Sequence, residues 1–299
     1  MGFTIRLTDN FGAAVLIAGC WTSAIGADDE SAMNPFFTAR NYTLPQDTIM
    51  VMGLADLQVA RYSPNFATGM GMVEYGITSN WTAGFMVEGQ KIEGLPLTYG
   101  GERINTYFKV FPNDNVLNFT LYGEYEHLNG ASLYKMEVAG FGGENLTEPL
   151  TDARRTRVRT IEARALMYHD WGRTNLTFNF ISETGLDTNE TDFGYTWGIF
   201  RHPEWMGMAM AGMHDHSEPP MFSCQRLGYG VEMLGALGNT NQFGIYWNRE
   251  QHYLGPVISY VLAQNWTAHV EAVFGLTDVS DPVVFRMGLA YSLDHLLSR

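Results

Sequence analysis

The stretch that decides the fold is Tyr253–Leu293, which reads YLGPVISYVLAQNWTAHVEAVFGLTDVSDPVVFRMGLAYSL. Within it, Trp266–Leu276 alternates apolar residues with mostly small or polar ones, and this period of two is typical of a β-strand with one apolar face. The runs Leu254–Leu262 and Phe285–Leu293 show the same alternation. Short polar segments separate the three runs. The stretch therefore predicts three consecutive β-strands joined by turns.

The length of these strands suggests a sheet that crosses an apolar layer. Strands of about ten residues suit a layer that is about 25 Å thick. Aromatic residues lie near the strand ends, at Trp266, Phe274 and Tyr291. In a transmembrane barrel the apolar face would point outward, whereas in a soluble periplasmic β-sandwich the polar face would do so. Periodicity alone leaves both architectures open.

The composition of the whole chain restricts the alternatives. With 299 residues, the chain is long enough for one large barrel or two soluble domains. A formal net charge of -14 argues against nucleic acid as a partner. No apolar run approaches the length of a membrane-spanning helix.

The N-terminal sequence favours export. The apolar run Phe11–Gly19 follows Arg6, and small residues up to Ala27 precede an acidic cluster, so residues 1–27 are predicted to be a cleaved signal peptide. Ile17–Cys20 also resembles a bacterial lipobox, which would make Cys20 a lipidated N-terminus. A buried N-terminal strand is the remaining alternative. We expect residues 28–47 to be a periplasmic lead-in, residues 48–293 the barrel and residues 294–299 a C-terminal extension.

The rest of the chain adds nine strands to the closing three. They are expected at residues 48–61, 70–77, 81–91, 103–110, 117–127, 193–199 and 229–233, with two more in a hairpin over 158–183 that turns at 170–173. A further short strand over Ser132–Val138 is an option within the Gly-rich connection 128–156. The total of about twelve is an even number, as expected for an antiparallel up-and-down β-barrel of a single chain.

The connections between the strands alternate in length. Connections 2–3, 4–5, 6–7 and 10–11 are short, whereas 3–4, 5–6, 9–10 and 11–12 are longer. Short periplasmic turns and long external loops alternate in this way when both termini are periplasmic. The connection 202–225 is the exception, because it is long and lies on the side of the short turns.

Three segments carry a resemblance to a known family. MVEYGITSNWTAGFMVEG (72–89), GYGVEMLGALGNTNQFG (228–244) and the closing stretch are similar to an outer-membrane β-barrel family of Gram-negative bacteria, whose members are loosely labelled porins or transporters. The resemblance spans most of Met70–Leu293. It implies a fold and an outer-membrane location, and it carries no catalytic residues. The chain departs from such barrels after Leu293, where DHLLSR replaces the terminal aromatic that the outer-membrane assembly machinery reads.

Charged residues fall on the face of the strands that would line a lumen. An isolated Arg or Lys on the lipid face costs roughly 2–4 kcal/mol at the bilayer midplane, so these side chains are expected inside. The candidates are Glu74, Glu88, Arg103, Lys109, Glu124, Glu126, Glu162, Arg164, Glu232, His269, Glu271 and Arg286, with Glu183 beside them. One interpretation is a small pore that prefers cations. The other is a lumen filled by carboxylate–guanidinium pairs.

The long connection after residue 201 is rich in soft ligands. Copper(I) or zinc could bind here, because thioether, thiol and imidazole groups suit these ions. The candidate ligands are His202, Met206, Met208, Met210, Met213, His214, His216 and Cys224. Cys224 is expected to lack a disulfide partner if Cys20 is removed or lipidated. The alternative is a turn whose methionines pack on the barrel rim.

No motif of an enzyme stands out. Ser217 neighbours His216, but the chain has no GxSxG, HExxH or P-loop sequence. We therefore expect a barrel that passes small solutes or ions, with membrane lipid and the assembly machinery as partners and no cofactor. The alternative is a closed structural or interaction barrel whose Met/His-rich periplasmic turn binds a metal or a partner.

Overall fold

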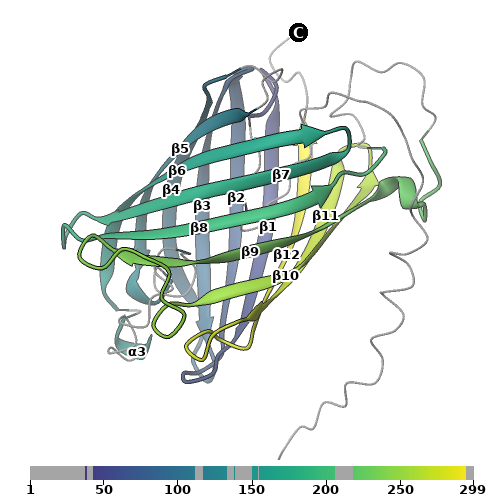
Figure 1. Ribbon diagram of the computed structural model, residues 1–299. Helices are drawn as coiled ribbons and strands as arrows, with labels where there is room; N and C mark the ends of the chain where they lie inside the picture. Colours follow the sequence, from purple (N-terminus) through teal and green to yellow (C-terminus); the bar gives the residue numbers. More distant parts are fainter. Residues whose placement is uncertain are drawn as a thin grey trace, which may run out of the picture.

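The protein is an all-β closed barrel in which all strands are antiparallel to their neighbours (Figure 1). The computed structural model describes residues 38, 43–111, 117–132, 138, 150–153, 155–205 and 218–293. In these residues the twelve strands are β1 Ile49–Val59, β2 Phe66–Thr78, β3 Trp81–Ile92, β4 Thr98–Lys109, β5 Asn118–Asn129, β6 Arg157–Trp171, β7 Thr174–Gly185, β8 Thr191–Arg201, β9 Leu227–Asn239, β10 His252–Ala263, β11 Trp266–Gly275 and β12 Val283–Leu293. The short helices α3 (Leu150–Ala153) and η3 (Cys224–Arg226) lie in connections.

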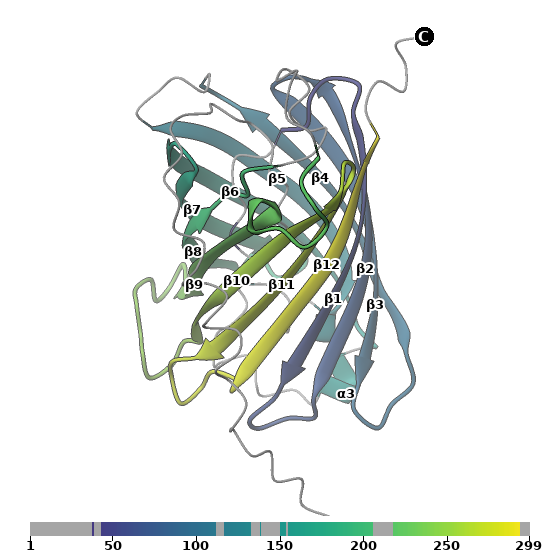
Figure 2. The same ribbon diagram turned by 90° about the vertical axis from the view of Figure 1, so that its right-hand side faces the viewer.

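The barrel closes between its first and last strands. Each strand pairs with its neighbours in sequence, and β1 pairs with β12 from Ile49↔Leu293 to Val59↔Val283 (Figure 2). The predicted up-and-down barrel is therefore confirmed. The sandwich alternative is wrong, because a closed ring of strands leaves no edge.

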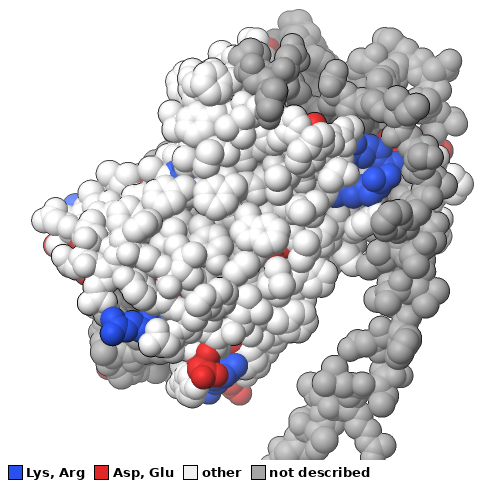
Figure 3. Space-filling view, in the orientation of Figure 1, with Lys and Arg blue, Asp and Glu red and all other residues white. Residues whose placement is uncertain are grey.

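The two faces of the strands differ in the way that their alternation predicts. Val73 is 47% exposed on the outer face, whereas the side chain of the next residue, Glu74, is fully buried. The outer surface in Figure 3 is almost free of charged residues along the middle of the barrel, and charges gather near its ends. Trp266 and Tyr291 contact each other in a tilted arrangement at one end of this apolar belt, with ring centroids 4.6 Å apart. The outer face thus resembles the lipid-facing belt of a membrane barrel.

The two ends of the barrel carry different connections between strands. At one end, here called the turn end, β1 begins, β12 ends, and residues 79–80, 172–173 and 264–265 form tight turns. The opposite end, the loop end, holds the connections β1–β2, β3–β4, β5–β6, β7–β8, β9–β10 and β11–β12. The β8–β9 connection lies at the turn end, as expected. No helix in the described ranges is long and apolar enough to cross a membrane.

Several strands are longer than predicted, including β2, which begins at Phe66 rather than at residue 70, and β9, which ends at Asn239 rather than at residue 233. β4 begins at Thr98 rather than at residue 103, so the β3–β4 connection is shorter than expected. A register shift at Glu88/Gly89 interrupts the alternation in β3 and β4, which hid the start of β4 from a period-two search. At the optional strand Ser132–Val138, Ser132 is helical and Val138 lies in a bend, and residues 133–137 are outside the described part of the chain.

Candidate functional site: the charged interior of the barrel

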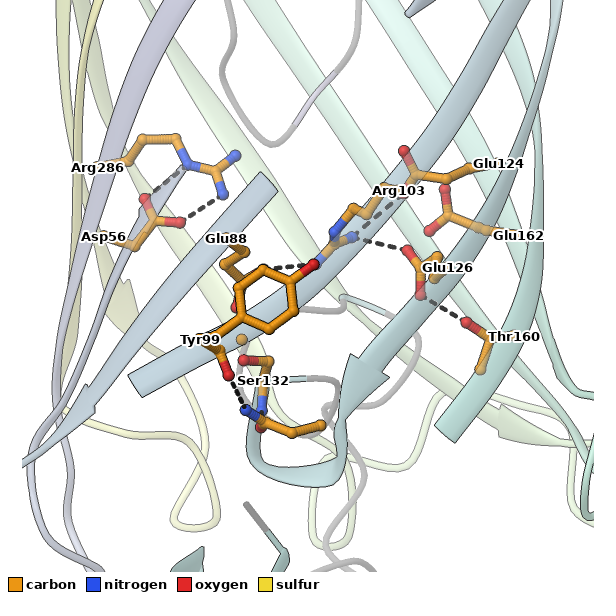
Figure 4. Close-up of polar contacts among 12 residues, drawn as sticks. Asp56, Glu88, Tyr99, Arg103, Glu124, Glu126, Ser132, Thr160, Glu162 and Arg286 are labelled. Carbon is orange, nitrogen blue, oxygen red and sulfur yellow. Dashed lines mark hydrogen bonds and ion pairs between the residues drawn. The ribbon is translucent and has the colours of Figure 1, made fainter. Parts of the chain in front are cut away.

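The side chains expected inside are almost all hidden from solvent. Exposure is 9% or less for Glu74, Glu88, Arg103, Lys109, Glu124, Glu126, Glu162, Glu183, Glu232, His269, Glu271 and Arg286. Arg164 keeps 16% of its side chain exposed. Figure 4 shows members of this set on different strands pointing into the barrel. These positions of the inner wall are therefore polar and charged.

Arg103 on β4 is the centre of one charged cluster (Figure 4). Its Nη1 lies 2.7 Å from Glu126 Oε1 and 3.2 Å from Glu124 Oε1, and its Nη2 lies 3.1 Å from Glu88 Oε2. The register explains the grouping, because Arg103 is directly opposite Glu126 on β5 and its other neighbour, β3, carries Glu88. One guanidinium on β4 thus balances three carboxylates from β3 and β5, the strands on either side of it.

Hydrogen bonds extend this cluster along the wall. Thr160 Oγ1 donates to Glu126 Oε2 at 2.6 Å, and the Tyr122 hydroxyl donates to Glu124 Oε2 at 2.6 Å. Arg164 pairs with Glu162 through Nη2 and Oε2 at 3.0 Å. Its guanidinium carbon lies 5.2 Å from the centroid of the Tyr122 ring, which is a cation–π contact. These contacts fix the carboxylates in place.

Three carboxylates lie side by side on β5, β6 and β7. Glu124 is directly opposite Glu162, and Glu162 is directly opposite Glu183. Like charges in directly opposed positions destabilise a sheet. Their retention inside the barrel therefore depends on Arg103 and Arg164, which lie on the same wall.

A second charged group lies where β1 meets β12. Arg286 donates from Nε and Nη2 to the two carboxylate oxygens of Asp56, at 2.8 and 2.7 Å (Figure 4). Glu271 on β11 is directly opposite Arg286, and neither of its carboxylate oxygens has a hydrogen-bond partner in the described structure. Asp56 was missed in the sequence because the inner face of β1 begins with Met50 and Met52, so the strand lacks a clear polar face. Its inward position in the alternation was the signal that could have found it.

Several buried amides on the inner face make no hydrogen bond to the described protein atoms. Both polar side-chain atoms of Gln58, Gln90 and Asn179 are in this position. An amide buried without a partner costs roughly 1–3 kcal/mol on the scale of protein mutations, so such groups are normally satisfied by protein or by water. The interior is thus chemically suited to water and to small polar solutes.

Comparison with known proteins identifies structures of similar fold. No protein-family model and no curated protein matches the chain. The COG4313 outer membrane channel from Pseudomonas putida F1 superposes with a TM-score of 0.53 at 11% sequence identity, over 87% of this chain and 99% of that chain. A KdgM porin in complex with disordered oligogalacturonate superposes with a TM-score of 0.50 at 8% identity, over 82% of this chain and 99% of that chain. The chain has the fold of outer-membrane channels and porins. This likeness confirms the resemblance in fold that the sequence suggested.

The charges on the outer face of this porin-like barrel lie near its ends. Arg159, near the start of β6, donates to Asp187 in the β7–β8 connection, and this hydrogen bond lowers the pKa of the Asp187 carboxyl. Nearby, His127 Nδ1 lies 2.8 Å from Glu102 Oε1 across β4 and β5. These pairs mark where the apolar belt stops at the loop end.

The expected metal ligands lie mainly outside the described residues. Met206, Met208, Met210, Met213, His214 and His216 all belong to the segment 206–217, as does Ser217. His202 is described, and Cys224 is disulfide-bonded rather than unpaired, so it provides no thiolate. Within the described ranges no group of three or more His, Cys, Asp or Glu residues is placed to hold a metal ion.

The two ends of the β8–β9 connection are held together. Trp205 N donates to Gln225 O at 2.8 Å, and the Arg226 guanidinium lies 4.1 Å from the centroid of the Trp205 ring. Arg226 also donates to the carbonyls of Pro219 and Val261 and pairs with Glu218 at 2.8 Å. This buried arginine fastens the connection to the end of β10 at the turn end of the barrel.

Proposed function

We propose that the protein is an outer-membrane barrel that passes small polar solutes or ions through its interior. The observation that carries this proposal is the reversal of polarity across the wall, with an apolar outer face and an inner face of charged, amide and hydroxyl groups. An apolar belt is stable against lipid, whereas the groups inside require a polar medium. The fold shared with a channel and a porin supports the same conclusion.

The proposed orientation follows from the two ends of the barrel. β1 begins and β12 ends at the turn end, which holds most of the tight turns, so this end is assigned to the periplasm of a Gram-negative bacterium. A signal peptide over residues 1–27, or lipidation at Cys20, would bring the chain there. Either step would take away the only other cysteine thiol, so Cys224 would be unpaired in the mature protein. Residues 28–47 then lead from the periplasm into the barrel, residues 48–293 form the barrel and residues 294–299 an extension that the assembly machinery must accept.

The interior should favour cations over anions. Carboxylates outnumber basic groups among the buried inward residues, with Asp56, Glu74, Glu88, Glu124, Glu126, Glu162, Glu183, Glu232 and Glu271 against Arg103, Lys109, Arg164 and Arg286. Rings of carboxylates create a field that concentrates cations in a channel. The KdgM porin is solved with oligogalacturonate, an acidic solute, whereas the acid-rich interior here suits cations or neutral solutes.

The burial of the inner side chains limits the size of what can pass. Glu74, Glu126 and Glu162 are fully buried, so the passage is proposed to be narrow. Small ions and solutes fit such a passage better than oligomers do. The barrel provides no reacting group in this proposal and acts as a selective passage rather than as an enzyme.

Conductance in a planar bilayer tests this function. The refolded full-length protein should give stable single-channel steps. Under a salt gradient, the reversal potential should shift toward the equilibrium potential of the cation. Insertion of the folded barrel without any conductance, in the wild type and in all variants discussed below, would contradict the proposal.

A closed barrel that binds a metal or a partner is the second candidate. It is favoured by the fastening of the β8–β9 connection through Arg226 and Trp205, which holds the base of the Met/His-rich segment in place. Copper(I) titration of the purified barrel should then show tight binding that is lost in a His214→Ala, His216→Ala double variant. A His127→Ala variant, altered at the opposite end, is the matched control. Equal copper retention by all three proteins would contradict this candidate.

A further inference from the structure

We propose that the inner wall of the barrel is a docking site for the chain's own residues Thr38, Thr43 and Leu44, which lie buried in the interior at the turn end. These residues precede β1, and their described members lie against inward-facing side chains. The docking itself stands on contacts within the barrel. Its consequence, closure of the passage, rests on the proposed function.

Leu44 is the first anchor of this segment. Its backbone N–H donates to Thr82 Oγ1 on β3 at 2.7 Å, in a buried hydrogen bond. Its side chain is 4% exposed and packs in a cluster with Met50, Met52 and Met72 from the inner faces of β1 and β2. The inner wall therefore buries the apolar side chain of Leu44 and accepts a hydrogen bond from its backbone N–H.

Gly76 on β2 allows the segment to approach the wall closely. A Cβ at this position would lie 2.0 Å from the Pro45 carbonyl oxygen, so any side chain would displace the segment. Asp47 N donates to Gly76 O at 2.9 Å, and Gly76 N donates to Thr48 O at 2.9 Å. The backbone of the segment is thus paired with β2 just before β1 begins.

Thr38 is the second anchor, on the opposite wall. Its backbone N–H donates to Glu232 Oε2 on β9 at 3.0 Å, and the residue is fully buried. In the ring of twelve strands, β9 is halfway round from β3, which holds Leu44. Six residues can extend over roughly 20 Å, enough to reach from one wall to the other. The two described anchors therefore lie on opposite walls of the interior.

The inner surface of β1–β3 has the composition of a buried contact. Methionines occupy inward positions at Met50, Met52, Met70, Met72 and Met86, alongside inward polar groups of the same strands. Methionine is a flexible apolar side chain that adapts to irregular surfaces. Apolar side chains do not stabilise a wall that faces water, whereas they do stabilise a wall that packs against Leu44. Two of these methionines, Met50 and Met52, made β1 difficult to recognise as a strand.

Hydrogen exchange on the full chain in detergent micelles tests the docking. In the wild type, the amides of Thr38 and Leu44 should exchange far more slowly than that of Tyr62, which is 68% exposed in the β1–β2 connection. Thr82→Val and Glu232→Gln should each raise exchange at the contacting amide about fivefold, since a hydrogen bond of this kind contributes about 1 kcal/mol. Thr196→Val is the matched control, because Thr196 is a buried inner hydroxyl on β8 without a hydrogen-bond partner in the described structure.

The same variants test closure of the passage. The Thr82→Val, Glu232→Gln double variant should conduct several-fold more than the wild type, while Thr196→Val should not. Fast exchange of the Thr38 and Leu44 amides in the wild type would overturn the docking, whatever the conductance. Slow exchange with equal, measurable conductance in wild type and double variant would overturn closure. Slow exchange in the wild type that the double variant abolishes, without conductance in any form, would keep the docking and contradict the proposed function.

Discussion

At the scale of the residue, the buried carboxylates decide how the interior treats ions. Glu124 is held by Arg103 and Tyr122, whereas Glu271 has no hydrogen-bond partner among the described atoms. A carboxylate whose charge is already balanced contributes less to the field in the passage than one whose charge is not. The two residues therefore probe the two kinds of acidic group on the inner wall.

Replacing Glu124 and Glu271 with Gln should weaken cation preference. Both changes keep the side-chain shape and remove a negative charge from the interior, so the reversal potential under a salt gradient should move toward zero. Glu271→Gln should have the larger effect. Glu102→Gln is the matched control, because Glu102 lies on the outer face near the loop end. Unchanged selectivity in both inner variants would contradict this field-based account.

Arg103→Met should destabilise the barrel by about 3–5 kcal/mol, the range for breaking a buried ion pair by removing one partner. The change leaves Glu88, Glu124 and Glu126 without the guanidinium that they share. Equilibrium unfolding in urea, with the protein in lipid vesicles, measures the loss. An added Glu126→Gln change should restore part of the stability, because it removes one of the uncompensated charges.

The matched comparison for Arg103→Met is Arg159→Met. Arg159 pairs with Asp187 at the surface, where its side chain is 54% exposed. Exposed ion pairs contribute little to stability, so the unfolding curve should barely move. Equal destabilisation by the two substitutions would show that burial of the Arg103 cluster has no energetic consequence.

At the scale of the element, the bulge between β3 and β4 depends on glycine. Gly101 has a φ of 153°, and a Cβ there would lie 2.3 Å from the His127 carbonyl oxygen on β5. Gly101→Ala should therefore lower the stability of the barrel by more than about 2 kcal/mol. Gly71→Ala in β2 is the control, because its Cβ would meet only Val87 Cγ2 at an ordinary 3.8 Å. Urea unfolding of both variants decides the matter, and equal stability would contradict the prediction.

The elements also show what alternation in a sequence can reveal. The hairpin β2–β3 was predictable because its outward residues meet one environment and its inward residues another. β1 was harder to recognise, because Met50 and Met52 face inward against Leu44 while the outward residues are apolar as well. The start of β4 was missed because a bulge shifts the phase of the alternation.

Contacts between distant residues were beyond what the sequence pattern could predict. The inward direction of Glu232 followed from the alternation of β9, but its bond to Thr38 joins residues 194 positions apart. In the same way, the position of Arg286 was predictable from β12, whereas its pairing with Asp56 depends on how the barrel closes. A period-two pattern gives the direction of a side chain, and the three-dimensional register gives its partner.

At the scale of the whole molecule, closure of the ring links stability to selectivity. Closure requires β1 to meet β12, and the Asp56–Arg286 pair lies on this seam with one partner on each strand. The Arg103 cluster similarly joins β3, β4 and β5. The charged groups proposed to select ions are therefore also contacts that hold neighbouring strands in register.

The outer belt makes a prediction about the lipid in which the protein folds. Charges near the loop end and the Trp266–Tyr291 pair at the turn end bound an apolar surface, and strands of this length suit a hydrocarbon layer of about 25 Å. Folding yield should thus be higher in short-chain phosphatidylcholine vesicles than in long-chain ones, because mismatch between belt and bilayer costs free energy. The shift in gel mobility between unheated and boiled samples measures the folded fraction. A protein that stays folded in the aqueous phase without lipid or detergent would contradict the membrane assignment, because its apolar belt would then have to tolerate water.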